Sequence, residues 1–372
     1  MALPSVGAFT DTYLPTVNGV TYTVQAWRDR WRDRGGDMAI VYPDADDYEP
    51  DDREYPVRSL PFPFYEGFRM GVPRVPEAIG DVDLVHAHTP FGLGMSAMRV
   101  ARSRDLPLIA SYHTPTSEYA AYVSLGDRVE RTVRRTATSY ERWFFDRADV
   151  VIAPSDRARD HIVETVDVST PVEVVPNGVD VQRLQPVAGD DFRTRYDLPT
   201  DRPLVGYTGR HGYEKCLSDI ISATDGMNVT VVFGGDGPAR DDIEARAEAA
   251  NVDVRFLGFL PREELPAFYS ALDAFAFPSP VETQGLVALE ANACGTPVAG
   301  VDSGALADTI EDGVNGYSYS QGDITGFRAA INRVLAEQDT LAEQCLSRRE
   351  TISIDHAVDR LTDVYESVLE DD

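Results

Sequence analysis

The 372-residue chain is predicted to be an α/β protein with two domains, each a parallel sheet covered by helices. Three observations lead to this prediction: the length, the alternation of short apolar runs with longer amphipathic stretches, and a single division of that pattern mid-chain. One hydrophobic core stops growing at about 250–300 residues, so this length favours two domains. Strands that alternate with helices pair into parallel sheets with helices on their faces.

Short apolar runs are predicted as strands and longer periodic stretches as helices. The strands are expected at residues 5–9, 38–42, 83–87, 106–111, 150–153 and 172–175, then at 204–207, 229–233, 254–257, 274–277 and 298–301. Helices are expected at 92–104, 128–145, 286–293 and 355–369. The alternation runs through both halves without a repeat or a low-complexity segment.

The pattern divides once, in the polar stretch 176–202 that opens with Pro176-Asn177-Gly178. We therefore expect a Rossmann-like domain at residues 1–180, a linker at 181–202 and a second Rossmann-like domain at 203–354. Residues 355–372 are expected to form a helix that packs back on the first domain. Ligands of such sheets bind at the carboxyl ends of the strands, so the chemistry is expected in a cleft across which the two sheets face each other.

The composition is strongly acidic: 62 Asp and Glu stand against 34 Lys and Arg, a formal charge of −28. Lys215 is the one lysine, and the other 33 basic residues are arginine. Such a surface repels nucleic acid and anionic lipid at low ionic strength, and molar salt screens that repulsion to about 3 Å. The acid is spread along the chain, which is typical of a solvated surface, and it indicates a salt-rich cytoplasm.

The sequence predicts a cytoplasmic protein. Its three cysteines form no CxxC pair, which argues against disulfides and a structural zinc site. The N-terminus lacks the basic and apolar regions of a signal peptide. Every apolar run is shorter than the roughly 20 residues that a membrane span requires.

The N-terminal half lacks the GxGxxG fingerprint, which removes the main support for a dehydrogenase. Its first strand runs instead into the loop 10–20, TDTYLPTVNGV. There Asn18-Gly19-Val20 can expose backbone N–H groups at a helix start.

Arg210 and Lys215, in YTGRHGYEK, follow the first strand of the second half. Two cations on one loop can clamp a diphosphate, whose charge grows when it departs as a leaving group. Two solvated surface cations are the alternative. The single lysine favours the clamp, because a compact ammonium is not interchangeable with a guanidinium where a point charge is needed.

A second charged stretch lies at residues 278–297, where Glu282 precedes the helix start Gly285-Leu286 and Glu290 follows eight residues later. Free N–H groups at that helix start would bind the same anion. Glu282 could then reach a sugar and Glu290 ribose hydroxyls. A glycosidase pair needs carboxyls about 5–9.5 Å apart, whereas eight helical residues span about 12 Å. Exposed helix glutamates are the other alternative.

Three histidines, His86, His88 and His113, fall at or just past strand ends of the first half. They could be functional or buried structural residues, and we expect His113 to be functional. No acidic partner accompanies them at metal-ligand spacing, and Asp81-Val82-Asp83 precedes its strand, so no metal is expected. The turn 233–238, FGGDGP, is weak evidence by itself.

Together these stretches resemble the retaining glycosyltransferases of family 4, which have the GT-B fold of two Rossmann-like domains. The resemblance spans the whole chain, through GR-x4-K at Arg210 and Lys215, E-x7-E at Glu282 and Glu290, and NGVD at 177–180. FTDTYLPTVNGV, HAHTPFGLG and SYHT resemble members that glycosylate lipids, such as diacylglycerol glucosyltransferases, sulfoquinovosyltransferases and phosphatidylinositol mannosyltransferases.

The resemblance implies an acceptor-binding first domain and a second domain that binds a nucleotide-sugar, without metal or other cofactor. Its catalytic residues are implied to be His113, Arg210, Lys215 and Glu282, and its donor-binding residues Gly19, Arg210, Lys215, Gly285, Leu286 and Glu290. Tyr13, Asn18, His86 and His88 are candidates for the acceptor side. Cys216 and Gln284 depart from the family pattern and leave the donor open.

A lipid or lipid-linked acceptor at the membrane surface is the leading expectation. Phe62, Phe64, Tyr65 and Phe68 suggest an exposed apolar loop, and residues 128–147 hold six arginines beside Trp143-Phe144-Phe145. A soluble or glycan acceptor, a sugar-nucleotide epimerase and a non-catalytic sugar-nucleotide binder are the alternatives.

Overall fold

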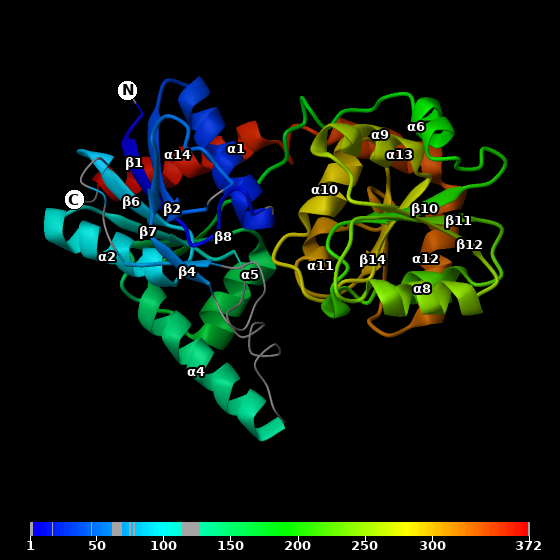
Figure 1. Cartoon of the computed structure of the whole chain (residues 1–372), viewed down its shortest axis with the longest axis horizontal. Helices are drawn as coiled ribbons and strands as arrows, with labels where there is room; N and C mark the ends of the chain where they lie inside the picture. Colours follow the sequence, from blue (N-terminus) through cyan, green and yellow to red (C-terminus); the bar gives the residue numbers. More distant parts are fainter. Residues whose placement is uncertain are drawn as a thin grey trace. The chain divides into compact units, whose positions relative to one another are not determined.

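The computed structural model describes residues 3–16, 18–45, 47–61, 69–73, 76, 79–113 and 127–370, and for 61 and 127–134 it describes the backbone alone. The chain forms two compact units (Figure 1). Unit 1 comprises Met1–Asn177 and Ile354–Asp372, and unit 2 comprises Gly178–Ser353.

Unit 1 is built on a parallel sheet of seven strands in the order β3-β2-β1-β6-β7-β8-β9. The strands are β1 (Ser5–Phe9), β2 (Asp37–Pro43), β3 (Glu54–Val57), β6 (Leu84–Ala87), β7 (Leu108–Ser111), β8 (Val150–Ala153) and β9 (Val172–Val174). A separate antiparallel hairpin pairs β4 (Ser59–Pro61) with β5 (Arg69–Gly71). The order reverses at β1, where a parallel sheet characteristically binds its ligand.

Helices cover both faces of this sheet, because alternate strand residues point to opposite sides. They are α1 (Gly19–Asp33), α2 (Gly92–Arg104), α4 (Asp127–Phe145), α5 (Asp156–Asp160), the π-helical turn η3 (His161–Val166) and α14 (Ile354–Glu370). Ala8 of β1 packs in one buried cluster with Trp27 of α1 and Leu361 of α14. Phe9, the next residue, packs in another with Leu93 of α2.

The C-terminal helix α14 belongs to unit 1, although unit 2 precedes it in the chain. Its apolar face packs against α1, where the Trp31 and Tyr365 rings meet edge to face at 5.3 Å. Arg34 at the end of α1 also donates to Asp359 at 2.7 Å. The residue pattern expected of 355–369, apolar on one face, thus meets a matching face on α1.

Unit 2 holds a parallel sheet of six strands in the order β12-β11-β10-β13-β14-β15. They are β10 (Leu204–Thr208), β11 (Thr230–Gly234), β12 (Asp253–Gly258), β13 (Ala274–Phe277), β14 (Val298–Val301) and β15 (Gly316–Tyr319). Its helices are α6 (Asp190–Arg195), η4 (Tyr213–Lys215), α7 (Ser218–Thr224), α8 (Arg240–Ala249), η5 (Arg262–Glu264), α9 (Leu265–Ala271), α10 (Leu286–Ala293), α11 (Leu306–Thr309), α12 (Ile324–Ala336) and α13 (Gln338–Ser347).

Both units are Rossmann-like α/β domains, as the sequence predicts, and a strand lies at each predicted position with ends shifted by up to two residues. β3, the hairpin and β15 lie outside the prediction. The stretch 181–202, expected as a linker, lies within unit 2, since Phe192 of α6 and Leu198 are buried in its core. Among the described residues, no helix is both long and apolar enough to cross a membrane.

Candidate active site

The two cations predicted as a phosphate clamp lie on the loop and short helix after β10. Nη2 of Arg210 is 2.5 Å from Oε1 of Glu214, and Nζ of Lys215 is 2.6 Å from Oε1 of Glu282. Burial disfavours the charged form of Lys215, but the carboxylates of Glu282 and Glu214 together outweigh this effect and raise the pKa of Lys215. The structure therefore joins the two charged stretches of unit 2 in one ion pair, although they are 67 residues apart.

The glycine turn after β11 supports this cation loop. The Gly209 amide donates to the Gly234 carbonyl at 3.2 Å, and the His211 amide donates to the Asp236 carbonyl at 2.8 Å. A Cβ on Gly235 would lie 2.0 Å from the Gly209 carbonyl oxygen. The glycine turn 233–238 thus allows the loop after β11 to approach the loop after β10, which carries Arg210 and Lys215, at the carboxyl ends of the two strands.

Glu282 stands on the loop between β13 and α10, and its carbonyl accepts from the Ala305 amide at 3.1 Å. Gly285 at the start of α10 has φ +74°, and a Cβ there would lie 2.6 Å from Leu306 Cδ2. Leu286 is the first residue of α10. Because the first amides of a helix have no intrahelical acceptor, this is where a negative group could accept hydrogen bonds from the backbone.

Glu290, one helix turn further along α10, points to a different neighbour. Its Oε2 accepts a 2.6 Å hydrogen bond from the hydroxyl of Tyr269 on α9. Burial raises the pKa of Glu290, and the Tyr269 hydrogen bond opposes that shift. Glu282 and Glu290 therefore have separate partners, Lys215 and Tyr269, and do not form a carboxyl pair with each other.

The three histidines form a buried column in unit 1. The His86 ring stacks on His88 with centroids 4.0 Å apart, and His88 stacks on His113 at 5.4 Å. Nδ1 of His88 lies 3.1 Å from Nε2 of His113. The Trp27 ring lies 5.9–6.3 Å from all three. The structure thus brings His88 and His113 into direct contact at the ends of β6 and β7.

Both nitrogens of His86 have partners inside unit 1: Nδ1 lies 2.7 Å from the Tyr365 hydroxyl, and Nε2 lies 2.7 Å from Oγ of Ser111. An imidazole held on both sides and without exposed surface is a structural residue of the column. His88 Nε2, in contrast, has no hydrogen-bond partner among the described residues. Of the two acceptor-side histidine candidates, His88 is thus the one with a buried ring nitrogen that has no hydrogen-bond partner among the described residues.

Unit 1 should lose stability in acid because of this column. Burial lowers the pKa of His113 to about 4 and holds the pKa values of His86 and His88 well below their usual range. The imidazoles therefore gain protons on unfolding, so the stabilisation is complete above pH 6.5 and declines toward pH 4, by about 3 kcal/mol for His113 alone. The measurement is denaturant unfolding followed by tryptophan fluorescence, since Trp27, Trp31 and Trp143 all lie in unit 1.

Changing His113 to glutamine should reduce that pH dependence by about one proton. A free energy of unfolding that stays constant from pH 7 to pH 4.5 would show that the imidazoles are not held neutral by burial.

The remaining first-unit candidates surround the loop after β1. The Asn18 side chain caps α1 by accepting from the Thr21 amide at 3.0 Å, and Gly19 is the first residue of that helix. Asn18 also donates to Oγ1 of Thr12 at 2.7 Å. Asn18 therefore stabilises the turn that precedes Gly19, and both its amide nitrogen and its amide oxygen are used in these hydrogen bonds.

Tyr13 belongs to a buried charge network. Its hydroxyl donates to Oε1 of Glu54 at 2.8 Å, and Tyr48 donates to Oε2 at 2.8 Å. Arg28 of α1 forms an ion pair with the same carboxylate, and the Glu54 side chain is 0% exposed. The Tyr13 hydroxyl thus faces the interior, so the side chain supports the loop from within.

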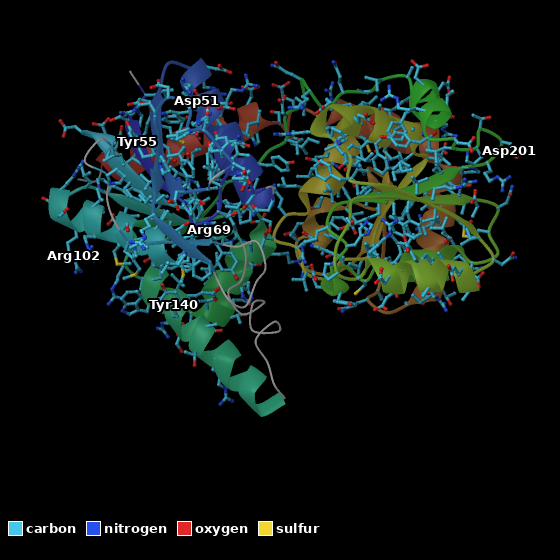
Figure 2. All side chains as sticks on the ribbon, in the orientation of Figure 1. Asp51, Tyr55, Arg69, Arg102, Tyr140 and Asp201 are labelled. Atoms are coloured by element: carbon cyan, nitrogen blue, oxygen red, sulfur yellow. The ribbon has the colours of Figure 1, made fainter. Side chains whose placement is uncertain are left out.

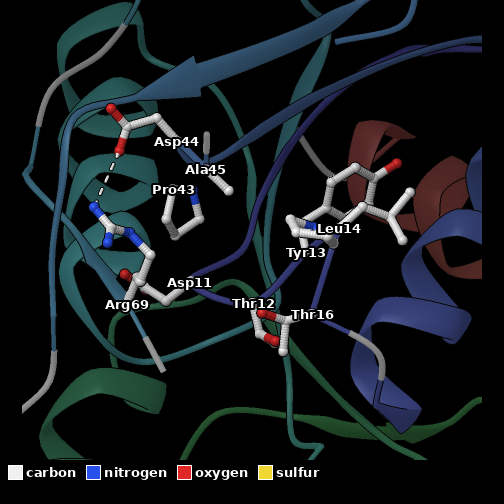
Figure 3. Close-up of a pocket in the computed structure, with 10 residues that line it drawn as sticks. Asp11, Thr12, Tyr13, Leu14, Thr16, Pro43, Asp44, Ala45 and Arg69 are labelled. Atoms are coloured by element: carbon white, nitrogen blue, oxygen red, sulfur yellow. Dashed lines mark ion pairs between the residues drawn. The ribbon is translucent and has the colours of Figure 1, made fainter. Parts of the chain in front are cut away.

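A shallow pocket lies over this loop, lined by Asp11, Thr12, Tyr13, Leu14, Pro15, Thr16, Pro43, Asp44, Ala45 and Arg69 (Figure 3). Asp44 and Arg69 form an ion pair at 3.9 Å at one side of it. Asp11, one of the lining residues, accepts from the Leu93 amide at 3.0 Å, from the Thr89 hydroxyl at 2.8 Å and from the Gly71 amide at 3.1 Å. Burial raises the pKa of Asp11 to about 6.

Among the residues that the structure describes, no group of three or more His, Cys, Asp or Glu side chains is placed to hold a metal ion. Asp83, in the DxD-like stretch, accepts from both the amide and the hydroxyl of Ser5 at 2.7 and 2.8 Å. It therefore ties β6 to β1 where both strands begin, at the edge opposite the histidines.

Of the aromatic residues expected at a membrane surface, two are buried, one is exposed and four lie outside the described residues. Phe144 and Phe145 are buried in the core of unit 1, so this part of the expectation is wrong. Trp143 is 38% exposed, and the Arg147 guanidinium lies 4.3 Å above its ring. Tyr140, labelled in Figure 2, stacks on Trp143 with the ring centroids 5.8 Å apart. Phe62, Phe64, Tyr65 and Phe68 and the side chains of Arg128, Arg131 and Arg134 lie outside the described residues, and Arg135 is exposed.

Sequence reasoning missed several residues that hold the site together, notably Asp11, Glu54, Glu214 and Tyr269. Asp11 lies just past the first strand, and this position alone could have indicated it. Glu54 and Tyr269 act through partners 26 and 21 residues away, and no local pattern marks such pairs.

Two family models match the chain: "Glycosyltransferase Family 4" at residues 17–183 and "Glycosyl transferases group 1" at 190–350. A GDP-mannose-dependent alpha-mannosyltransferase of Mycolicibacterium smegmatis is 30% identical, over 98% of this chain and 97% of its own. The alpha-monoglucosyldiacylglycerol synthase of Streptococcus pneumoniae is 28% identical, over 92% and 81%.

Among solved structures, sucrose-phosphate synthase from Thermosynechococcus elongatus superposes with a TM-score of 0.81 at 21% identity, over 99% of this chain and 100% of its own. That likeness confirms the fold, and the sequence relatives confirm the family. The chain therefore belongs to the GT-B glycosyltransferases, with a family 4 N-terminal domain and a group 1 C-terminal domain, and is an enzyme that transfers a sugar from a nucleotide-sugar.

Proposed function

We propose that the protein transfers a hexose, with retention of anomeric configuration, from a nucleotide-diphosphate sugar to a membrane lipid or lipid-linked acceptor. The observation that carries this proposal is the constellation of Arg210, Lys215 and Glu282 beside the start of α10. Two cations and a helix N-terminus at adjacent strand ends match the negative charge that develops on a departing diphosphate.

The proposed roles follow from these positions. Arg210 and Lys215 would hold the diphosphate, exchanging Glu214 and Glu282 for phosphate oxygens. The backbone at Gly285 and Leu286 would accept the same anion at the start of α10. Glu282, released from Lys215, would contact the sugar.

In unit 1, His113 would contact the transferred sugar. Its imidazole, which burial keeps neutral at pH 7, could donate or accept a hydrogen bond but would carry no charge. Gly19 at the start of α1 would allow the acceptor loop to approach the diphosphate. His88, which contacts His113, and the loop that holds Tyr13 and Asn18 would lie on the acceptor side.

A lipid acceptor is supported by the relative named alpha-monoglucosyldiacylglycerol synthase and by a patch at the C-terminal end of α4. The patch consists of Tyr140, Trp143 and Arg147, an aromatic pair under a guanidinium. Aromatic and basic side chains of this kind suit the interface between lipid headgroups and acyl chains. We propose that the protein works there, at the inner face of the cell membrane and in a salt-rich cytoplasm, to which its charge of −28 is suited.

The test is a panel of nucleotide-sugars incubated with total membrane lipid and read by mass, with and without EDTA. We expect one donor to yield a glycolipid with an α-linkage, at an equal rate in EDTA, because Arg210 and Lys215 supply the positive charge that a metal would otherwise bring.

Each other outcome identifies a competing function. Glycosylation of soluble glycans alone would replace the lipid acceptor, and an epimerised donor without an acceptor product would indicate an isomerase. Binding without turnover of any donor would indicate a non-catalytic protein. Activity that EDTA abolishes and magnesium or manganese restores would reverse the expectation of metal independence.

A further inference from the structure

The hydroxyl of Tyr269 donates to the Glu290 carboxylate, its one hydrogen-bond partner in the described part of the chain, and both residues lie where α9 and α10 pack together. The Tyr269 ring is fully buried, with Phe268 at 5.5 Å and Phe275 at 5.8 Å, both edge to face. Its backbone carbonyl accepts from the Thr296 hydroxyl at 2.6 Å. Ring packing and the backbone hydrogen bond therefore hold the tyrosine in place, and its hydroxyl is directed at Glu290.

A carboxylate fixed in this way has a defined orientation. The hydrogen bond engages Oε2 of Glu290 and stops the rotation that would otherwise exchange the two oxygens. Glu290 itself is only partly buried, so it reaches the surface of unit 2 from a buried support. The Tyr269 hydrogen bond engages Oε2, so Oε1 is the atom that could accept from a ligand hydroxyl.

The same hydrogen bond preserves the charge on this carboxylate. Burial raises the pKa of Glu290, and the Tyr269 hydroxyl is the first interaction that counters it. An ionised carboxylate accepts hydrogen bonds about twice as strong as a neutral one does, so the tyrosine keeps Glu290 in its stronger accepting form.

We propose that Tyr269 is a positioning residue for ribose recognition: it orients Glu290 so that Oε1 accepts from a ribose hydroxyl of the donor nucleotide. The inference rests on the proposed function, in which Glu290 binds the ribose of the nucleotide-sugar. It predicts that Tyr269 controls discrimination between a ribonucleotide and its deoxy analogue, a property that general packing would not affect.

The experiment measures dissociation constants by titration calorimetry, using whichever of UDP, GDP and ADP binds the wild type most tightly, together with its 2′-deoxy and 3′-deoxy analogues. The wild type should prefer the ribonucleotide over at least one analogue by about tenfold or more, as expected for a charge-assisted hydrogen bond. Tyr269→Phe should reduce this preference at least threefold, while the affinity for the deoxy analogue stays unchanged.

The preference in Tyr269→Phe should also become dependent on pH, falling in mild acid and recovering as the pH rises. Without the tyrosine hydroxyl, the burial that raises the pKa of Glu290 is less opposed, so the carboxylate takes up a proton at a higher pH. The wild type should show a smaller change over the same range.

Tyr317→Phe is the matched control. Its hydroxyl donates to Glu337 at 2.6 Å, the same length as the Tyr269 bond, and it lies in the same unit near the start of β15. This variant should keep the wild-type preference, although it loses an equivalent tyrosine–glutamate hydrogen bond.

Glu290→Gln distinguishes the role of Tyr269 from the role of Glu290 in ribose binding. If it abolishes the ribose preference but Tyr269→Phe keeps it, the role of Tyr269 is refuted and the ribose role of Glu290 stands. If Glu290→Gln itself keeps the preference, both assignments are wrong. A Tyr269→Phe variant that weakens binding of ribo- and deoxynucleotide equally would reduce Tyr269 to a packing residue.

Discussion

Replacing Lys215 with alanine should reduce sugar transfer by about 10²–10³-fold, because it removes a positive charge from the leaving-group diphosphate. The loss should appear in kcat at saturating donor as well as in kcat/KM, since the charge on the diphosphate grows as the glycosidic bond breaks. The measurement is the initial rate of glycolipid formation with the donor identified in the panel, accompanied by circular dichroism to show that the variant is folded.

Two variants sharpen this test. Arg348→Ala removes a partner from the 2.5 Å ion pair with Glu311 on the surface of unit 2, and it should leave the rate unchanged. Lys215→Arg keeps the charge and changes its shape, so it should remain impaired if a compact ammonium is required. Transfer by Lys215→Ala within about threefold of the wild type would disprove the clamp, because the expected loss is far larger.

Replacing Arg28 with methionine should destabilise unit 1 by about 3–5 kcal/mol, the usual cost of leaving one member of a buried ion pair unpartnered. Glu54 would remain fully buried with its hydrogen bonds from Tyr13 and Tyr48 but without its positive partner. Since domains are stable by only about 5–15 kcal/mol, this loss would lower the unfolding midpoint strongly. Denaturant unfolding followed by tryptophan fluorescence measures it, because the three tryptophans lie in unit 1.

The control lies on the same helix. Arg32 contacts Asp51 and Asp52 at 3.7 and 3.8 Å on the surface, so Arg32→Met should cost less than about 1 kcal/mol. The double variant Arg28→Met with Glu54→Gln should recover much of the loss, since it leaves no unpaired charge. Equal stability of the Arg28 and Arg32 variants would show that the network contributes no more than surface ion pairs do.

The sequence was sufficient for the layout of the strands, because a strand buried on both faces leaves a continuous apolar run such as residues 274–277, AFAF. It was not sufficient for β3, whose residues Glu54-Tyr55-Pro56-Val57 include a charge and a proline. The structure shows why a charge is tolerated there: Glu54 is neutralised by Arg28 from α1, a partner that no local pattern reveals.

The candidate site divides in the same way. Four charged residues of unit 2 could be predicted because they fall in two motifs of fixed spacing. Arg210 and Lys215 lie in GR-x4-K, and Glu282 and Glu290 lie in E-x7-E. The partners Glu214 and Tyr269 could not, because one acidic residue among 62 carries no distinguishing mark and a core tyrosine is identical in pattern to a packing residue. Side-chain pairing depends on how helices meet, which periodicity does not encode.

Because α14 completes unit 1 from the far end of the chain, the order of synthesis differs from the order of completion. The 176 residues of unit 2, 178 to 353, leave the ribosome before α14 does. At about 5–20 residues per second, this interval lasts roughly 10–35 s. During it, the face of α1 that holds Trp27 and Trp31 lacks the apolar residues of α14 that later cover it. Unit 1 thus begins to be translated before unit 2 but is completed after it, so its incomplete form persists while unit 2 is made.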